Sequence, residues 1–177
     1  TQVSLRYPNR EVRASLNGVL LQQLMQSDTQ YGKNASRLYA LLKINDWIGL
    51  KSLFHAFFSS IPNDWYRRNR IAEFEGYYAS IFYSHFAALG LDICLEDVTN
   101  RGRIDMTVLF NGHVYIFEFK VVESNPEGDA LAQIKERAYA DKYRARNEPI
   151  HLIGVEFSKD HKNIVGFETE TFLMFNV

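Results

Sequence analysis

Residues Asn111 and Gly112 stand between two apolar runs, and this pair restricts the fold of the chain more than any other feature of its sequence. Asn-Gly is typical of the two-residue turn that joins antiparallel strands, because both central residues take a positive φ there. The flanking runs, 105–110 and 113–122, are rich in β-branched and aromatic residues. They therefore predict a β-hairpin.

Charged residues cluster toward the open end of this hairpin. Counting outward from a two-residue turn places Asp105 opposite Glu118, and Arg103 opposite Lys120 on the same face. Opposed carboxylates, with Cβ atoms roughly 5 Å apart, destabilise a sheet unless a cation lies between them. A bulged turn would shift the pairing by one residue and would still leave these groups near each other.

Glu118 and Lys120 interrupt a strand that is otherwise apolar. An unpaired charge in a central strand costs on the order of several kcal/mol, so such residues are kept when they are paired or bound to metal. One interpretation is an ion pair between the two on a half-exposed sheet. Because Asp105 would place a second carboxylate opposite Glu118, the pattern favours a metal site over a simple ion pair. Carboxylate oxygens suit Mg²⁺ or Mn²⁺, and a nearby ammonium can stabilise developing negative charge.

The rest of the chain predicts an α/β fold with a helical N-terminal part. Apolar residues recur at helical spacing from Asn9 to Ser60, and Asp46 is a plausible N-cap within that stretch. Helix, strand and hairpin signals then alternate. We expect a helix capped by Asn69 and ending at Gly90, a strand at 91–98, the hairpin, a helix capped by Asp129 and running through Tyr143, and strands at 150–157 and 164–167.

Composition excludes several classes of protein. The 177 residues are 46% hydrophobic and carry a net charge of −1, which argues against a domain that coats nucleic acid by bulk charge. Local basic surfaces remain at 67–70 and at Arg101 with Arg103. The lone Cys94 excludes a disulfide framework and favours a cytoplasmic protein. The sequence has no membrane-helix or signal pattern and begins at Thr1, so we expect a piece of a longer chain.

The segments Gly102-Arg103-Ile104-Asp105 and Phe117-Glu118-Phe119-Lys120 resemble the core motif of the PD-(D/E)XK nuclease superfamily. The resemblance covers about 73–167 and implies a restriction-endonuclease-like αβββαβ core with a mixed sheet. The stretches GRIDM, YIFEFK and QIKERAYADKY, with the opening YPNREV, are similar to an uncharacterised bacterial family. In that family such a nuclease domain follows an AAA-ATPase-like domain.

The resemblance implies roles for individual residues. Asp105, Glu118 and Lys120 match the core motif, while Ile104 replaces the usual proline. Glu75 on the preceding helix would join Asp105 and Glu118 as a metal ligand. We prefer Glu75 to Glu73 because it shares a helix face with apolar residues that should point at the sheet.

Gln133, on the helix that follows, would lie beside the site as a ligand for substrate or water, although an exposed helix glutamine is an equal alternative. Tyr143 is a candidate for stacking on bases, with packing as its alternative. No catalytic or metal-binding role is expected for any of the five histidines. The predicted nucleic-acid contacts are Arg101, Arg103, Arg137 and Tyr143.

The sequence therefore predicts a helical connecting region at 1–68 and a nuclease domain at 69–177. We expect hydrolysis of phosphodiester bonds, with DNA favoured over RNA, using Mg²⁺ or Mn²⁺. One alternative is a catalytically silent module that binds nucleic acid or a partner within a larger ATPase protein. Another is a structural sheet domain with coincidental charges. The ATPase-like domain is the expected partner, and no membrane is involved.

Overall fold

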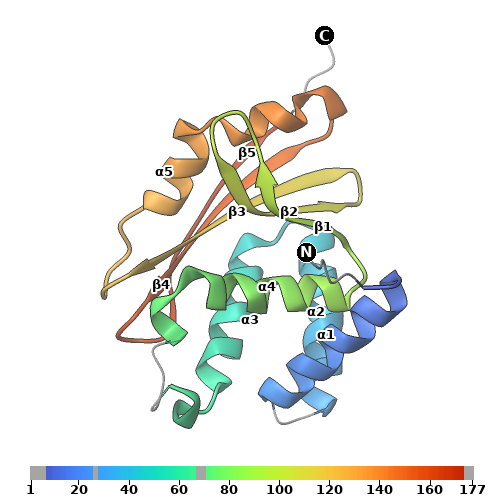
Figure 1. Cartoon of the computed structure of the whole chain (residues 1–177), viewed down its shortest axis with the longest axis vertical. Coiled ribbons are helices and arrows are strands. Elements are labelled where there is room, and N and C mark those ends of the chain that lie inside the picture. The colour runs from blue at the N-terminus through green and yellow to red at the C-terminus, as the bar shows by residue number, and fades with distance from the viewer. Residues whose placement is uncertain (1–6, 26–27, 67–70, 174–177) are drawn as a thin grey trace, which may run out of the picture.

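The computed structural model describes residues 7–25, 28–66 and 71–173. A helical N-terminal part leads into a five-stranded mixed sheet with helices on both faces, which confirms the predicted α/β fold class (Figure 1). The elements are α1 (Arg10–Met25), α2 (Asp28–Lys43), α3 (Trp47–Ser60), η1 (Asn63–Trp65), η2 (Ile71–Glu73), α4 (Glu75–Ala88), β1 (Asp92–Val98), β2 (Arg103–Phe110), β3 (His113–Val122), α5 (Asp129–Glu136), η3 (Tyr139–Arg146), β4 (Ile150–Ser158) and β5 (Asn163–Phe172).

The sheet has the strand order β1-β2-β3-β4-β5. All neighbours are antiparallel except β3 and β4, which run parallel. A parallel pair needs a crossover, and α5 with η3 supplies it on one face of the sheet. Helices α1 to α4 lie on the opposite face (Figure 1). None of the helices in the described ranges has both the length and the apolar character needed to span a bilayer.

Alternation along β3 decides which face each residue serves. Tyr115, Phe117 and Phe119 join the core shared with the N-terminal helices. Val114 and Ile116 join a second, smaller core beneath α5 and η3. The helical part therefore packs directly on the sheet, since a single buried cluster runs from the helices into β3 and β4.

The Asn-Gly turn forms as predicted. Asn111 has φ 52° and Gly112 has φ 72°, the positive values of a type I′ turn. The ladder between β2 and β3 keeps the predicted register from Phe110↔His113 to Met106↔Phe117. It stops there, so the expected Asp105↔Glu118 and Arg103↔Lys120 positions are not ladder pairs.

The starts of two helices differ from prediction. Helix α4 begins at Glu75 because Phe74 is extended, with φ −109° and ψ 125°. The expected cap Asn69 lies outside the described residues. Asp129 is the first residue of α5 and not its cap, because Gly128 precedes it at φ 80°.

The buried carboxylate of Glu156 instead holds the start of α5, because it accepts the N–H of Ala130 at 3.4 Å and that of Glu127, in the loop before the helix, at 2.7 Å. The helix also ends earlier than expected. Ala138 adopts φ 48°, and the chain continues as a 3-10 helix instead of an α-helix through Tyr143. Strand β5 extends beyond the expected 164–167.

Phe82 on α4 joins the helical part to the sheet. It is fully buried and its ring contacts those of Phe54 on α3 and Phe119 on β3. We predict that Phe82→Ala lowers the free energy of unfolding by about 3–5 kcal/mol, because it leaves a cavity between two layers. Phe74→Ala, at a ring 63% exposed, is the control. Urea denaturation of both variants measures the difference, and equal losses would contradict this account of the core.

Candidate active site

Asp105 lies where both of its neighbouring ladders are interrupted. The pairing of β1 with β2 passes from Leu95↔Met106 to Asp97↔Ile104 and leaves Asp105 without a partner. The pairing of β2 with β3 ends at Met106, the residue next to Asp105. Its carboxylate fills the gap: Oδ2 accepts the backbone N–H of Phe119 at 2.9 Å. The side chain therefore substitutes for a missing backbone partner and is fixed where β2 and β3 part.

Glu118 is 2% exposed, on the face of β3 that α5 covers. The side-chain amide of Gln133 on α5 donates to its Oε1. Its other oxygen, Oε2, is buried and has no hydrogen-bond partner. A buried carboxylate oxygen left without a donor is costly, so this atom is free to accept a proton or a cation.

Lys120 lies between two acidic side chains. Its Nζ is 3.7 Å from Oε1 of Glu118 and 3.6 Å from Oε1 of Glu75. The lysine side chain is 26% exposed, so its ammonium reaches solvent on one side and the buried carboxylate on the other. The structure thus brings the predicted residues Asp105, Glu118, Lys120, Glu75 and Gln133 together at one end of the sheet.

Glu75 reaches the site from a different face of the sheet than the one expected. We expected its helix to cover the sheet face that carries Glu118, but α4 packs on the opposite face, where Phe82 contacts Phe117 and Phe119. Glu75 is the first residue of α4 and reaches Lys120 from that helix end. A residue at a helix terminus is not restricted to the side that the helix packs against, which helix-phase arguments overlook.

Burial controls the protonation of the site. Burial first, and then the nearby charge of Asp105, raise the pKa of Glu118 to about 8, while the charge of Lys120 and a hydrogen bond from the Asp105 backbone oppose the rise. Burial also raises the pKa of Asp105, which the hydrogen bond from Phe119 and the charge of Lys120 oppose. Two carboxyl groups whose pKa values are both raised form a site that gains from a cation.

The residues fit a hard divalent cation in part. Carboxylate oxygens of Asp105 and Glu118, one of them unpaired, are the donors that Mg²⁺ prefers. Across the described ranges, however, no group of three His, Cys, Asp or Glu side chains is gathered to hold an ion. The predicted third ligand, Glu75, instead contacts Lys120. A cation here would take its remaining ligands from water and substrate.

The predicted nucleic-acid contacts fall at the edge of this site. Arg101, Arg103 and Arg137 are exposed. Arg103 forms an ion pair with Glu96, and Arg137 donates to the backbone oxygen of Arg101 at 2.9 Å. Tyr143 is half-buried against the smaller core, and its hydroxyl donates to Asp97. The predicted basic cluster at 67–70 lies outside the described residues.

Sequence reasoning missed two polar clusters. Buried Asp97 on β1 accepts from Lys142 and Tyr143 of η3, and no spacing in the sequence links these segments. His113 and His151 lie 2.8 Å apart, Nδ1 to Nε2, because β3 and β4 run parallel from their first residues. Only knowledge of that pairing would have joined the two histidines.

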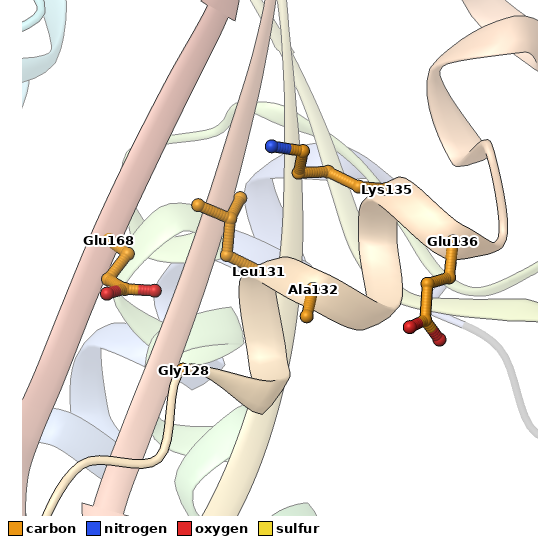
Figure 2. Close-up of a pocket in the computed structure, with 6 residues that line it drawn as sticks. All are labelled: Gly128, Leu131, Ala132, Lys135, Glu136 and Glu168. Atoms are coloured by element: carbon orange, nitrogen blue, oxygen red, sulfur yellow. The ribbon is translucent and has the colours of Figure 1, made fainter.

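A hollow of about 360 Å³ between α5 and β5 is separate from the acidic site. Figure 2 shows Leu131 and Lys135 on the helix and Glu168 on the strand. None of the predicted site residues lines it. Lys135 is held by Glu170 at 2.7 Å, so the cation beside this hollow is already paired.

Comparison with known proteins gives two findings. Residues 73–167 match the family model described as PD-(D/E)XK nuclease superfamily. The chain is also 64% identical, over 167 residues, to the "Uncharacterized protein in vnfD 5′region" of Azotobacter chroococcum mcd 1. That match covers 94% of this chain and 32% of the relative, so the chain spans about a third of the relative's length.

We predict that Glu118→Gln stabilises the metal-free protein at pH 8 and has little effect near pH 5. The folded protein keeps a proton on Glu118 that the unfolded chain releases, so this group reduces stability as pH rises from its usual pKa of 4.5 to about 8. Neutral Gln removes that loss, on the order of 1–3 kcal/mol. Thermal melting in EDTA at both pH values measures it. Glu136→Gln, at an exposed glutamate, is the control. The prediction would be refuted if the stability of Glu118→Gln relative to the parent were lower at pH 8 than at pH 5.

Proposed function

Because this chain belongs to the PD-(D/E)XK nuclease superfamily, we propose that it is a metal-dependent nuclease that hydrolyses phosphodiester bonds in DNA. One observation carries the proposal. Asp105, Glu118 and Lys120 meet where β2 and β3 part, with one buried carboxylate oxygen left without a partner. A structural ion pair does not need the second carboxylate, whereas a site for an ion and a phosphate does.

Asp105 and Glu118 would hold Mg²⁺ or Mn²⁺. When bound, such an ion supplies Lewis-acid polarisation of a phosphodiester oxygen and a nucleophile at neutral pH. The chain's own part is to fix the two carboxylates. Asp105 is held by the amide of Phe119, and Glu118 is held by Gln133.

Lys120 would stabilise the negative charge that develops on the phosphate. Its ammonium cannot ligate a cation, yet it lies within 4 Å of the carboxylate that would. In the structure it is shared between Glu75 and Glu118. Glu75, the more exposed of the two, would then keep Lys120 charged and oriented, or turn to the ion as a further ligand.

Gln133 has a positioning role in this proposal. Its amide donates to the same Glu118 oxygen that faces Lys120, so Glu118 Oε2 is the atom left for the ion. The amide can also hydrogen-bond water or phosphate from the opposite side of the site to Glu75. Gln133 on α5 would therefore act on the reaction by positioning the carboxylate of Glu118.

A catalytically silent module is the second candidate. Its support is the contact of Lys120 with both Glu75 and Glu118, and the absence, within the described ranges, of three acidic or imidazole side chains gathered for an ion. Such a module would bind nucleic acid or a partner without cutting. Cleavage assays separate the two candidates directly.

We also propose that the domain works within a longer cytoplasmic protein that includes an AAA-ATPase-like part, with residues 1–68 as the connecting region and 69–177 as the nuclease domain. The relative is about three times as long as the aligned segment, in agreement with further domains. Helix α1 supports a connecting role, because one face carries apolar side chains that are 42–50% exposed: Val12, Leu16, Val19 and Leu20.

Lys120→Ala is predicted to abolish cleavage of plasmid or single-stranded DNA while leaving Mn²⁺ binding largely intact. Loss of a charge that stabilises the transition state costs on the order of a hundredfold or more in rate. Asp105→Ala should remove both activity and metal binding, because it deletes one of few protein ligands. A nicking assay beside calorimetric titration of Mn²⁺ measures both effects.

Lys135→Ala, at an exposed lysine on α5 that is paired with Glu170, is the matched control and should cleave like the parent. Parent-level cleavage by Lys120→Ala would overturn the catalytic role. Absence of cleavage by the parent with Mg²⁺ or Mn²⁺, together with binding of DNA, would favour the silent module.

A further inference from the structure

A groove of about 430 Å³ lies beside the acidic site, between the turn that joins β1 to β2 and the 3-10 helix η3. Its lining residues are Val98, Thr99, Asn100, Ala138, Asp141 and Lys142. Val98, at the end of β1, forms part of one wall of the groove. It pairs with Arg103 on β2, and Arg103 is two residues before Asp105. The groove therefore opens at the end of the sheet where Asp105 and Glu118 lie.

The two walls of this groove are fastened together by side chains that donate to backbone oxygens of the opposite wall. Tyr139 donates to Arg103 at 3.0 Å, Arg137 to Arg101 at 2.9 Å, and Lys142 to Val98 at 2.9 Å. Gly102 allows this approach, because a Cβ there would lie 2.9 Å from the Tyr139 hydroxyl. The groove is consequently preformed and does not depend on a ligand to assemble it.

Charges around the groove favour an anion. Lys142 is held at its rim by buried Asp97, and Asp141 is neutralised by Arg144 at 2.6 Å. None of the salt bridges among the described residues includes Arg101 or Arg137, and Arg137 donates to a backbone oxygen instead of a carboxylate. Arg137 follows Gln133 by four residues, about one helical turn, so cationic groups continue directly from the residue that contacts Glu118.

The interior of the groove suits a nucleobase. Val98 is 70% exposed and, with Ala138, offers an apolar surface. Asn100 is exposed, and its side-chain amide has no hydrogen-bond partner in the described part of the chain, so both its donor and its acceptor can meet a base edge. The volume lies within the range of about 300–1,000 Å³ that is usual for small-ligand sites.

We propose that this groove binds one unpaired nucleotide of the strand that the site cuts. The base would lie against Val98 and Ala138, and its phosphate near Arg137. A base can enter such a groove only when it is out of the duplex stack, so the preferred substrate has a single-stranded segment next to the cleaved bond. The inference rests on the proposed function, because it assigns the groove to the substrate of that same site.

Fluorescence anisotropy in EDTA tests the groove without any chemistry, using a labelled single-stranded DNA and a blunt duplex of the same sequence. The parent should bind the single strand more tightly. Val98→Glu places a carboxylate inside the groove and should weaken single-strand binding by about tenfold or more. Val19→Glu, at a valine 50% exposed on α1, is the matched control and should bind like the parent.

Asn100→Ala is the second variant, because this exposed side chain has no partner whose loss could unfold the protein; it should weaken single-strand binding without changing the melting temperature. Tighter binding of the blunt duplex by the parent, or unchanged single-strand binding by both groove variants, would overturn the proposal. Failure of the nuclease function would look different. The groove effects would persist in EDTA while the parent fails to cut with Mg²⁺ or Mn²⁺.

Discussion

An ionised carboxylate inside a protein has to be balanced by a cation or by hydrogen-bond donors, and Glu118, on the central strand β3, is 2% exposed with one oxygen unpaired. Gln133 and Lys120 both contact its other oxygen. Because burial and the charge of Asp105 raise the pKa of Glu118, its neighbourhood is short of positive charge. The arrangement of the site follows from this shortage.

The fold brings a second carboxylate and the polar groups that surround Glu118 to one place. Strands β2 and β3 pair regularly from the Asn-Gly turn to Met106↔Phe117 and then part. Asp105 enters the gap by accepting the amide of Phe119, which brings a second carboxylate toward Glu118. Helices from opposite faces of the sheet then contribute Glu75 and Gln133. Two carboxylates, a lysine and a glutamine therefore meet at one end of the sheet.

Much of this could be predicted from sequence, since the signals were local. The turn residues Asn111-Gly112 set the register, and the apolar run of β3 marked Glu118 and Lys120 as exceptional charges. What failed depended on long-range geometry. The face of the sheet that α4 covers could not be predicted from the helix phase of Glu75. Helix α5 ends early at Ala138, which has a left-handed backbone conformation, and no glycine in the sequence indicated this end. The pairing of Asp97 with Lys142 required the β1–η3 contact to be known.

We propose above all that Asp105 and Glu118 form a divalent-cation site. Anomalous scattering from crystals of the protein soaked in Mn²⁺ tests it most directly, because it locates the ion without reference to activity. We expect a manganese peak between the Asp105 and Glu118 carboxylates, and we expect it to be lost in crystals of Asp105→Ala. A well-ordered site with Lys120 still contacting Glu118 and no manganese peak at millimolar Mn²⁺ would contradict it.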